Sequence, residues 1–299
     1  MIFVITGATS FIGLELIKLL HLKGEEVIAV CRKESNKQKR IPNGIKIINA
    51  SMEDYGELDK FINKADIFIN LAWEGTGHSG RDLAQIQKDN IKNTLAAMIS
   101  SKRMGCKLFI ESGSQAEYGI INTIIREDTE CHPFSEYGKA KLEVLKKGQL
   151  LSQELGLKYV HLRIFSIYGE NDHPWTLFST CIKKMKNDED ISLSDCTQYW
   201  NFLYVKDAVS LIYKLIKEVI SDKQHQCEIY NLASNDTRVL KDFVLEMKNT
   251  TSSNSKLKFG EINVSNRVNL QPSIEKLLKV IGNFEFTPFH KIIKNTYDR

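Results

Sequence analysis

The first twenty residues of the chain constrain its fold more than any other segment. A short apolar run at residues 1–5 suits a buried parallel strand. The turn Thr6-Gly7-Ala8-Thr9-Ser10-Phe11-Ile12-Gly13 follows, and residues 14–20 then have the apolar spacing of a helix. A strand, a glycine-containing turn and a helix form the phosphate-binding unit of a dinucleotide-binding fold.

The small residues of this turn have specific roles in such a unit. Gly7 permits the tight turn, Ala8 lets the backbone approach a pyrophosphate, and Gly13 allows the helix to pack closely on the strand. The pyrophosphate would lie at the helix N-terminus, where free N–H groups and the helix dipole favour anions. We therefore predict that the cofactor-binding residues include Gly7, Thr9, Ser10, Phe11, Ile12 and Gly13.

The pattern after this turn predicts a doubly wound α/β fold of the Rossmann type. Apolar strand-like runs alternate with helical patterns, which is typical of a parallel sheet with helices on both faces. With 299 residues the chain can bury a large core. The expected strands are 2–6, 26–31, 45–49, 66–71, 107–112 and 158–165, and the expected helices are 11–23, 55–63, 82–104 and 135–155.

The alternation breaks after residue 165. Shorter elements follow, with helices expected near 175–187, 206–220, 239–248 and 273–281 and strands near 199–205 and 228–232. We predict a dinucleotide-binding Rossmann domain over residues 1–166 and a smaller, mixed α/β substrate-binding lobe over residues 167–299. Part of the second half, near residues 200–232, is expected to return to the first domain.

Charge and cysteine usage exclude several classes of partner. The formal net charge is +4 and the basic residues are mostly scattered, so we expect neither nucleic acid nor a membrane as a partner. The six cysteines have no metal-ligand spacing, and His78 and His173 have no ligand-like partners, so no metal is expected. The first strand begins at residue 2, and a reduced, cytoplasmic protein is the expectation.

Tyr137 and Lys141 are four residues apart in a predicted helix, a spacing that places both side chains on one face. A cation beside a phenol lowers the pKa of the phenol. Tyr137 is therefore a candidate proton donor or acceptor near neutral pH. Upstream, Ser114 offers a second hydroxyl that can polarise a carbonyl. The predicted catalytic residues are Ser114, Tyr137 and Lys141.

Together these segments resemble the extended short-chain dehydrogenase/reductase superfamily, and within it the nucleotide-sugar epimerase/dehydratase/reductase group. The resemblance covers nearly the whole chain. It rests on Asn70-Leu71-Ala72, on Asn90, and on residues 6–13, 112–119, 137–141, 162–169 and 200–208.

The resemblance implies roles for the candidate residues. Ser114 would orient the carbonyl, Tyr137 would exchange a proton with the sugar oxygen, and Lys141 would hold the cofactor ribose and depress the Tyr137 pKa. Further cofactor contacts would be Leu71, Ala72, Asn90 and Ile164. The substrate-binding residues would be Trp73, Ser112, Gly113, Ser166, Trp175, Asn201 and Arg267, with Arg238 as an alternative to Arg267 for the diphosphate and core packing as the alternative for the tryptophans.

Two departures from the group are informative. Its dehydratases carry a Thr-Asp-Glu triplet where this chain has Ser114-Gln115-Ala116, so 4,6-dehydration is not expected. Glu117 comes one place too late for that role and is expected to be an exposed acid.

NAD-preferring relatives usually end the second strand with Asp, which bonds the ribose 2′-OH, but here the strand ends at Cys31, which Arg32 follows. Because arginine suits a 2′-phosphate, NADP(H) is favoured, and NAD stays open.

Three functions fit these residues. The first is NADPH-dependent reduction of the 4-keto group of a 4-keto-6-deoxy nucleotide sugar in deoxysugar nucleotide biosynthesis, as in 4-ketoreductases of the CDP-abequose-synthase type. The second is an NAD-dependent nucleotide-sugar 4-epimerase, which needs the same residues but retains its cofactor. The third is a non-catalytic dinucleotide-sensing protein, although such relatives commonly lose the Tyr or Lys that this chain keeps. A homodimer formed through residues 82–104 and 135–155 is a further implication of the resemblance.

Overall fold

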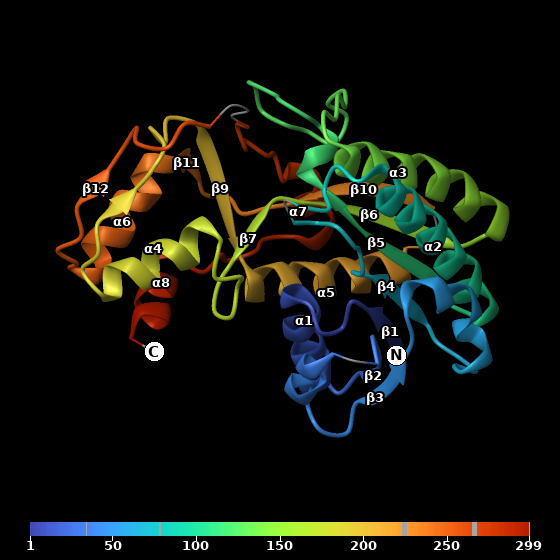
Figure 1. The fold of residues 1–299 in the computed structure, drawn as a ribbon. Coiled ribbons are helices and arrows are strands. Elements are labelled where there is room, and N and C mark those ends of the chain that lie inside the picture. The colour runs from blue at the N-terminus through green and yellow to red at the C-terminus, as the bar shows by residue number, and fades with distance from the viewer. Residues whose placement is uncertain (34, 78, 223–225, 265–267, 299) are drawn as a thin grey trace.

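The centre of the protein is a seven-stranded parallel sheet, seen in a computed structural model that describes residues 1–33, 35–77, 79–222, 226–264 and 268–298 (Figure 1). The strand order is β10-β6-β5-β4-β1-β2-β3, and all adjacent pairs are parallel. The doubly wound α/β prediction is thereby confirmed. The strands are β1 (Ile2–Thr6), β2 (Glu26–Cys31), β3 (Lys46–Asn49), β4 (Ile67–Asn70), β5 (Leu108–Ser114), β6 (Lys158–Ile164) and β10 (Cys227–Leu232).

Helices cover both faces of this sheet, as the period-two alternation of strand side chains requires. Phe3 and Ile5 of β1 point into a core that includes α1 and α5, whereas Val4 between them points into a core formed with α2 and α3. The first face carries α1 (Phe11–Leu22), α5 (Val205–Ser221) and α7 (Glu275–Ile281), and the second carries η2 (Met52–Lys60), α2 (Ala84–Arg103) and α3 (Glu136–Leu155).

Serine caps fix the starts of the two helices that matter most for the site. The Ser10 hydroxyl accepts a hydrogen bond from Gly13 N, and the Ser135 hydroxyl accepts one from Gly138 N. Such caps satisfy backbone donors that have no partner inside the helix. They therefore place the N-termini of α1 and α3 at defined positions relative to the strands before them.

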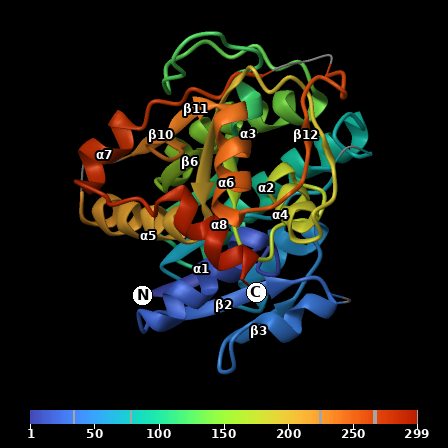
Figure 2. The ribbon, with the colours of Figure 1, turned by 90° about the vertical axis from the view of Figure 1, so that its left-hand side faces the viewer.

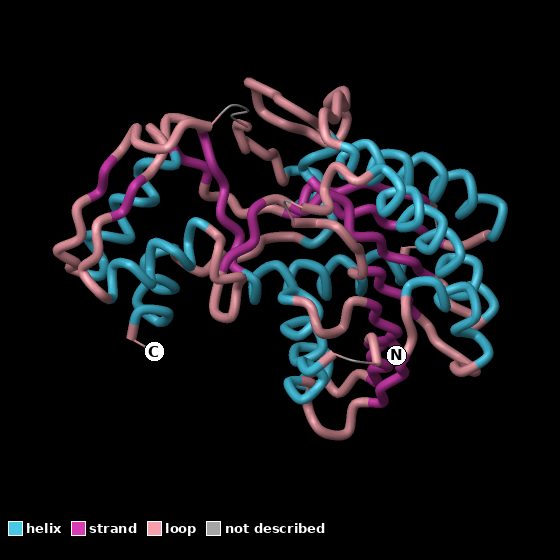
Figure 3. Tube along the Cα trace, in the orientation of Figure 1, coloured by secondary structure: helices cyan, strands magenta, loops and turns pink. Residues whose placement is uncertain are grey.

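A second, smaller body follows β6 and is separated from the large sheet in the view of Figure 3. It holds a three-stranded sheet in the order β11-β9-β7 and a two-stranded pair, β12-β8. Five aromatic rings, Tyr168, Phe178, Phe202, Phe243 and Phe289, form its centre. Figure 2 shows this body from its own side. Its elements are β7 (Ser166–Tyr168), α4 (Leu177–Lys186), β8 (Ile191–Ser192), β9 (Tyr199–Tyr204), β11 (Thr237–Val239), α6 (Leu240–Thr251), β12 (Leu257–Lys258) and α8 (Phe289–Tyr297).

The chain passes between the two bodies more than once. After β9 it enters α5, which packs against α1, and β10 then joins the edge of the large sheet beside β6. A domain boundary at residues 166 and 167 stays a prediction. No helix in the described part of the chain combines the length and apolar character needed to cross a bilayer.

The structure corrects several expected elements. The helix expected at 55–63 is the 3₁₀ segment η2, which begins at Met52 because Ser51 and Asp54 form a capping box there. The strand expected at 158–165 is confirmed as β6, which ends one residue earlier, and β7 follows it as a separate strand that was not predicted. The strands β8, β11 and β12 have only two or three residues, which is too short for a readable alternation. Helix α8 and the short 3₁₀ segments η1 (Asn36–Arg40) and η3 (Gln115–Glu117) were also not predicted.

The role assigned to Gly13 leads to a stability prediction. A Cβ atom at Gly13 would overlap Gly7 O and lie 3.1 Å from Ala8 C, because the helix starts directly against the turn. We expect Gly13→Ala to lower the free energy of unfolding by about 1–3 kcal/mol, measured by urea denaturation. Gly77→Ala is the matched control, since nothing lies within 4 Å of a Cβ there. Equal stability of the two variants would contradict the close packing.

Candidate active site

A cavity of about 740 Å³ opens at the carboxyl edge of the large sheet. It lies where the strand order reverses about β1 and β4, the place at which doubly wound sheets bind ligands. Predicted cofactor residues from the ends of three neighbouring strands meet there. They are Gly7, Thr9 and Ser10 after β1, Arg32 after β2, and Leu71 and Ala72 after β4, and the predicted substrate residue Trp73 lines the same cavity.

The residues of this cavity fit a dinucleotide. Gly7 has a positive φ of 63°, and a Cβ there would lie 2.7 Å from Leu71 C, so the turn lies against the chain that follows β4. Phe11 packs toward the aromatic core of the second body, and Ile12 packs into the sheet core. Their side chains therefore point away, and this helix start presents backbone to an anion.

Arg32, which follows β2, lines the cavity. Its guanidinium is 3.9 Å from the Glu74 carboxylate, and 74% of its side chain is exposed. An exposed ion pair of this kind is weak. Arg32 is thus free to exchange Glu74 for a more highly charged partner, and Lys37 lines the same cavity.

Tyr137 lies in the first turn of α3, beneath the loop that follows β4. Its N–H donates to Arg81 O at 3.0 Å, and the Arg81 guanidinium lies 4.4 Å from the centre of its ring. Burial raises the pKa of Tyr137, while a hydrogen bond with Ser114 and the charge of Arg81 act in the opposite direction. The phenol therefore keeps its proton at neutral pH.

Lys141 lies on the same side of α3, but its contacts differ from the expectation. Its Nζ is 3.3 Å from Glu111 Oε1 and donates to Ser112 O at 2.5 Å. It also lies 3.5 Å from the centre of the Trp73 ring, against 6.0 Å from that of Tyr137. The prediction that Lys141 lowers the pKa of Tyr137 is wrong for this arrangement, because its charge is directed to Glu111.

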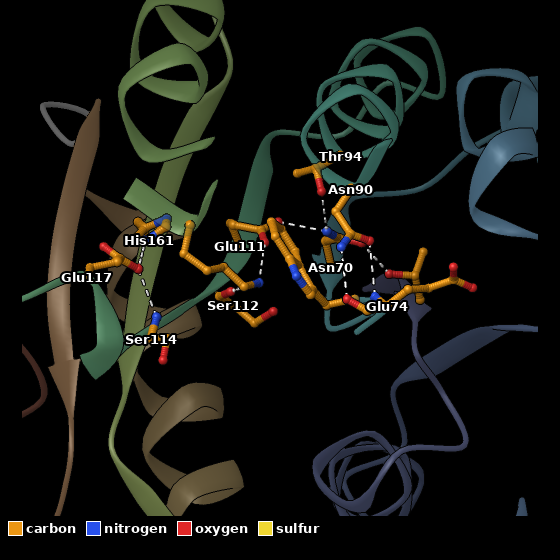
Figure 4. Close-up of polar contacts among 12 residues, drawn as sticks. Asn70, Glu74, Asn90, Thr94, Glu111, Ser112, Ser114, Glu117 and His161 are labelled. Atoms are coloured by element: carbon orange, nitrogen blue, oxygen red, sulfur yellow. Dashed lines mark hydrogen bonds and ion pairs between the residues drawn. The ribbon is translucent and has the colours of Figure 1, made fainter. Parts of the chain in front are cut away.

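A buried polar chain extends from Glu111 across the sheet (Figure 4). Asn70 Nδ2 donates to Glu111 Oε2 at 2.7 Å and to Thr94 Oγ1 at 3.3 Å, and Thr6 Oγ1 donates to Asn70 Oδ1 at 2.5 Å. Glu111, Asn70 and Thr6 are completely buried. The chain links β1, β4 and β5 directly below the candidate site.

Ser114 ends β5, and a second buried cluster holds it in place. Ser114 N donates to Glu117 Oε1, and His161 Nε2 contacts the same oxygen, both at 2.8 Å (Figure 4). Arg163 Nε donates to Glu117 Oε2, also at 2.8 Å. Burial opposes ionisation of Glu117, but the charge and hydrogen bond of His161 and the charge of Arg163 lower its pKa to about 2. The expectation of an exposed acid at Glu117 is therefore wrong.

Gly113 and Ser112 lie between these two clusters. A Cβ at Gly113 would overlap His161 Nε2 and lie 2.7 Å from Glu117 Oε1, so glycine makes room for the ionic cluster. Ser112 is buried, and its carbonyl accepts the Lys141 hydrogen bond.

Asn90 and Asn201, two other predicted site residues, hold main chain in place. Asn90 Nδ2 donates to Glu74 O at 2.9 Å and Asn90 Oδ1 accepts from Glu74 N at 3.0 Å (Figure 4). Asn201 Nδ2 donates to Ser234 O at 2.9 Å, and its Oδ1 accepts from Ser234 N at 3.0 Å. Asn90 thereby fixes the loop that borders the cavity, and Asn201 fixes a turn of the second body.

The remaining predicted residues are spread between the two bodies. Trp175 is exposed and stacks on His173 at 4.4 Å, and His173 lines the cavity. Ile164 ends β6 and packs on the sheet core, while Ser166 opens β7 and is half-buried. Arg267 lies outside the described residues.

Arg238, the alternative for a diphosphate contact, is engaged elsewhere. Its guanidinium bonds both Asp236 carboxylate oxygens and Glu246, and it lies 4.1 Å from the centre of the Phe243 ring.

His78, which the sequence analysis set aside as a metal ligand, is not among the described residues. Within the described ranges, no three His, Cys, Asp or Glu side chains gather as metal ligands would.

The sequence analysis missed Arg81, Glu111 and the partners of Glu117. A signal for Glu111 was present, because an acid interrupts the apolar run that forms β5. His161 and Arg163 likewise alternate with apolar residues in β6. Ionisable residues in a predicted buried strand indicate paired charges. Arg81 had no comparable signal, since it lies in a loop.

Comparisons with known proteins agree with this geometry. A model of the NAD dependent epimerase/dehydratase family matches residues 3–233. CDP-abequose synthase of Salmonella muenchen is 25% identical over 267 residues, which cover 86% of this chain and 83% of that protein. The dTDP-6-deoxy-L-talose 4-dehydrogenase (NAD(+)) of Aggregatibacter actinomycetemcomitans is 24% identical over 250 residues, covering 81% and 88%.

Solved structures share the fold at lower identity. The UDP-glucose 4-epimerase of Thermotoga maritima, solved with UDP-glucose, has a TM-score of 0.87 and 21% identity, covering 100% of this chain and 98% of that one. The UDP-glucuronic acid 4-epimerase of Bacillus cereus, solved with UDP-glucuronic acid and NAD, has a TM-score of 0.83, 21% identity and the same coverage. Because the family match spans most of its length, this chain belongs to the NAD dependent epimerase/dehydratase family, whose members are NAD(P)-dependent nucleotide-sugar enzymes of the extended short-chain dehydrogenase/reductase type.

Proposed function

We propose that this enzyme uses NADPH to reduce the 4-keto group of a 4-keto-6-deoxy nucleotide sugar. The observation that carries the proposal is the buried Tyr137 phenol, which shares a hydrogen bond with Ser114 at the carboxyl end of β5. A phenol beside a second hydroxyl can donate a proton to the alkoxide that forms when a carbonyl is reduced. Gln115 and Ala116, in place of the dehydratase acids, argue against elimination and fit both reduction and epimerisation.

The relatives support a substrate of this class. The name dTDP-6-deoxy-L-talose 4-dehydrogenase describes oxidation and reduction at C4 of a nucleotide-linked deoxy sugar, and CDP-abequose synthase has the higher identity of the two. We therefore place the sugar between the cavity and the second body. There Trp175, stacked on His173, offers an exposed ring face to a sugar or a base.

The proposed mechanism divides the work among four side chains. Bound NADPH supplies hydride to the C4 carbon. Ser114 orients the carbonyl oxygen, and Tyr137 donates its proton to that oxygen as negative charge develops. The Arg81 guanidinium over the ring then stabilises the phenolate that remains. Lys141, on the next turn of α3, holds the ribose hydroxyls and so positions the hydride donor.

An NAD-dependent 4-epimerase is the second candidate, because a relative from Lactobacillus helveticus and several solved neighbours are UDP-sugar 4-epimerases. Cofactor retention separates the two functions. Purified protein that carries stoichiometric NAD would favour the epimerase, and NADPH consumed only in the presence of a 4-keto sugar nucleotide would favour the reductase.

We also propose a homodimer formed through α2 and α3, which a monomer mass in light scattering would contradict.

The reaction is tested by following NADPH absorbance with CDP-, dTDP- and GDP-linked 4-keto-6-deoxy sugars. We expect one of them to be reduced, and Tyr137→Phe to lower kcat by about 10²–10⁴-fold because the proton donor is lost. Cofactor affinity of that variant should stay close to that of the parent protein. Turnover by Tyr137→Phe at the parent rate would contradict the assigned acid.

Cofactor preference is tested at Arg32. Loss of a charge-assisted contact to the 2′-phosphate costs about 1.5–3 kcal/mol, so Arg32→Ala should weaken NADPH binding by about 10–100-fold. NADH binding should be unaffected, as measured by fluorescence titration. The adjacent Lys33→Ala is the matched control, because Lys33 does not line this cavity. Parent protein that binds NADH as tightly as NADPH would rule out the assignment.

The pH dependence of the reaction is tested at Arg81. Its positive charge stabilises the phenolate, so its removal should raise the pKa of Tyr137 further. Because Tyr137 acts as an acid, kcat/KM falls as the pH rises through that pKa. Arg81→Met should therefore move this fall to higher pH, and Lys139→Met, on the same helix but exposed and paired with Glu136, should not. If kcat/KM of Arg81→Met falls at the same pH as in the parent protein, the guanidinium does not affect the pKa of Tyr137.

A further inference from the structure

Two ionisable side chains face each other below the cofactor cavity, away from water. Glu111 is completely buried, Lys141 is 1% exposed, and Lys141 Nζ lies 3.3 Å from Glu111 Oε1. The proposed reaction uses Lys141 but gives no role to Glu111. Burying a charge costs several kcal/mol per ion unless it is paired and hydrogen-bonded, so an acid in the central strand β5 calls for an explanation.

The neighbours of the pair favour the ionised form of both groups. Asn70 Nδ2 donates to Glu111 Oε2 at 2.7 Å, which stabilises a carboxylate. Lys141 Nζ donates to Ser112 O and lies 3.5 Å from the centre of the Trp73 ring, which stabilises an ammonium. Burial raises the pKa of Glu111 and lowers that of Lys141, and the opposite charges and these hydrogen bonds oppose both shifts. With 3.3 Å between Nζ and Oε1, the two groups are within ion-pair distance.

Other titratable groups around the pair are engaged with different partners. Glu117 lies on η3 and pairs with His161 of β6 and with Arg163. Tyr137, with Arg81 over its ring, lies one turn before Lys141, and Tyr159 bonds His161 Nδ1 on the far side. In the described part of the chain, Glu111 is the acid within ion-pair distance of Lys141.

We propose that Glu111 is a positioning residue, whose carboxylate keeps Lys141 charged and held under Trp73, which lines the cofactor cavity, before a ribose arrives. Lys141 then meets the cofactor already protonated and ordered, so less entropy is lost when the ribose hydroxyls bind. The inference concerns the cofactor-free protein. It stands whether the enzyme reduces or epimerises its sugar.

The pair makes the charge of Lys141 sensitive to substitution at Glu111. Burial lowers the pKa of Lys141, and the charge of Glu111 raises it again. Without that charge the pKa of Lys141 falls further, and the amine becomes neutral at a lower pH. When Lys141 is neutral, its amine no longer places a positive charge over the Trp73 ring.

Trp73 reports this charge directly, because a protonated amine over an indole ring changes its emission. We would record the emission of cofactor-free protein against pH in a Trp175→Phe/Trp200→Phe background, which leaves Trp73 as the single tryptophan. Glu111→Gln should move the titration midpoint to lower pH by about 1–3 units, the effect of losing one opposite charge at this distance. Glu111→Asp should recover part of the shift, and Lys141→Met should abolish the titration.

Glu15→Gln is the matched control, because Glu15 is a buried acid on α1 whose ion pair is with Lys18. It should leave the midpoint unchanged. A midpoint that Glu111→Gln does not move, or that Glu15→Gln moves equally, would overturn the proposal.

A double-mutant cycle covers the case in which Glu111→Gln does not fold. If the two residues act as a pair, removing Glu111 costs less stability once Lys141→Met has removed its charged partner, since no buried charge is left uncompensated. Circular dichroism shows whether the double variant folds where Glu111→Gln does not, and urea denaturation measures the coupling where both single variants fold. Recovery of folding in the double variant supports the ion pair. The same loss of stability with and without Lys141→Met would show that Glu111 acts only through packing.

Discussion

The buried polar layer beneath the cofactor cavity depends on the parallel register of three central strands. Asn70 of β4 lies beside Glu111 of β5, and Glu111 lies beside His161 of β6. Because neighbouring parallel strands end at the same edge, this register collects polar side chains from distant parts of the chain into one buried layer. The cofactor cavity opens directly above that layer.

Two ionic clusters in this layer have different consequences for the site. Glu117 bonds both His161 and Arg163 and accepts a hydrogen bond from Ser114 N, which fixes the end of β5. Glu111 and Lys141 tie β5 to α3, the helix that carries Tyr137. The first cluster supports the main chain at Ser114, and the second lies buried under Trp73, which lines the cavity.

This division changes the electrostatics of Tyr137, the candidate acid. A Tyr–Lys pair four residues apart suggests a phenol activated by the lysine, but the lysine charge is balanced by Glu111. What remains beside the phenol is Arg81, which comes from the loop after β4 and shares a hydrogen bond with the Tyr137 main chain. Asn90 holds the earlier part of the same loop through two hydrogen bonds with the Glu74 main chain.

The sequence by itself determined the doubly wound fold, the glycine turn and the identity of Ser114, Tyr137 and Lys141 as candidates. These features depend on local periodicity and on short motifs, which act within a few residues and can be read along the chain. Only the tertiary structure decided that Glu111 takes the Lys141 charge, that Arg81 covers Tyr137, and that Glu117 is buried. Those contacts join residues 30 to 56 positions apart, and electrostatic energies depend on distance and burial in space, which no spacing along the chain specifies.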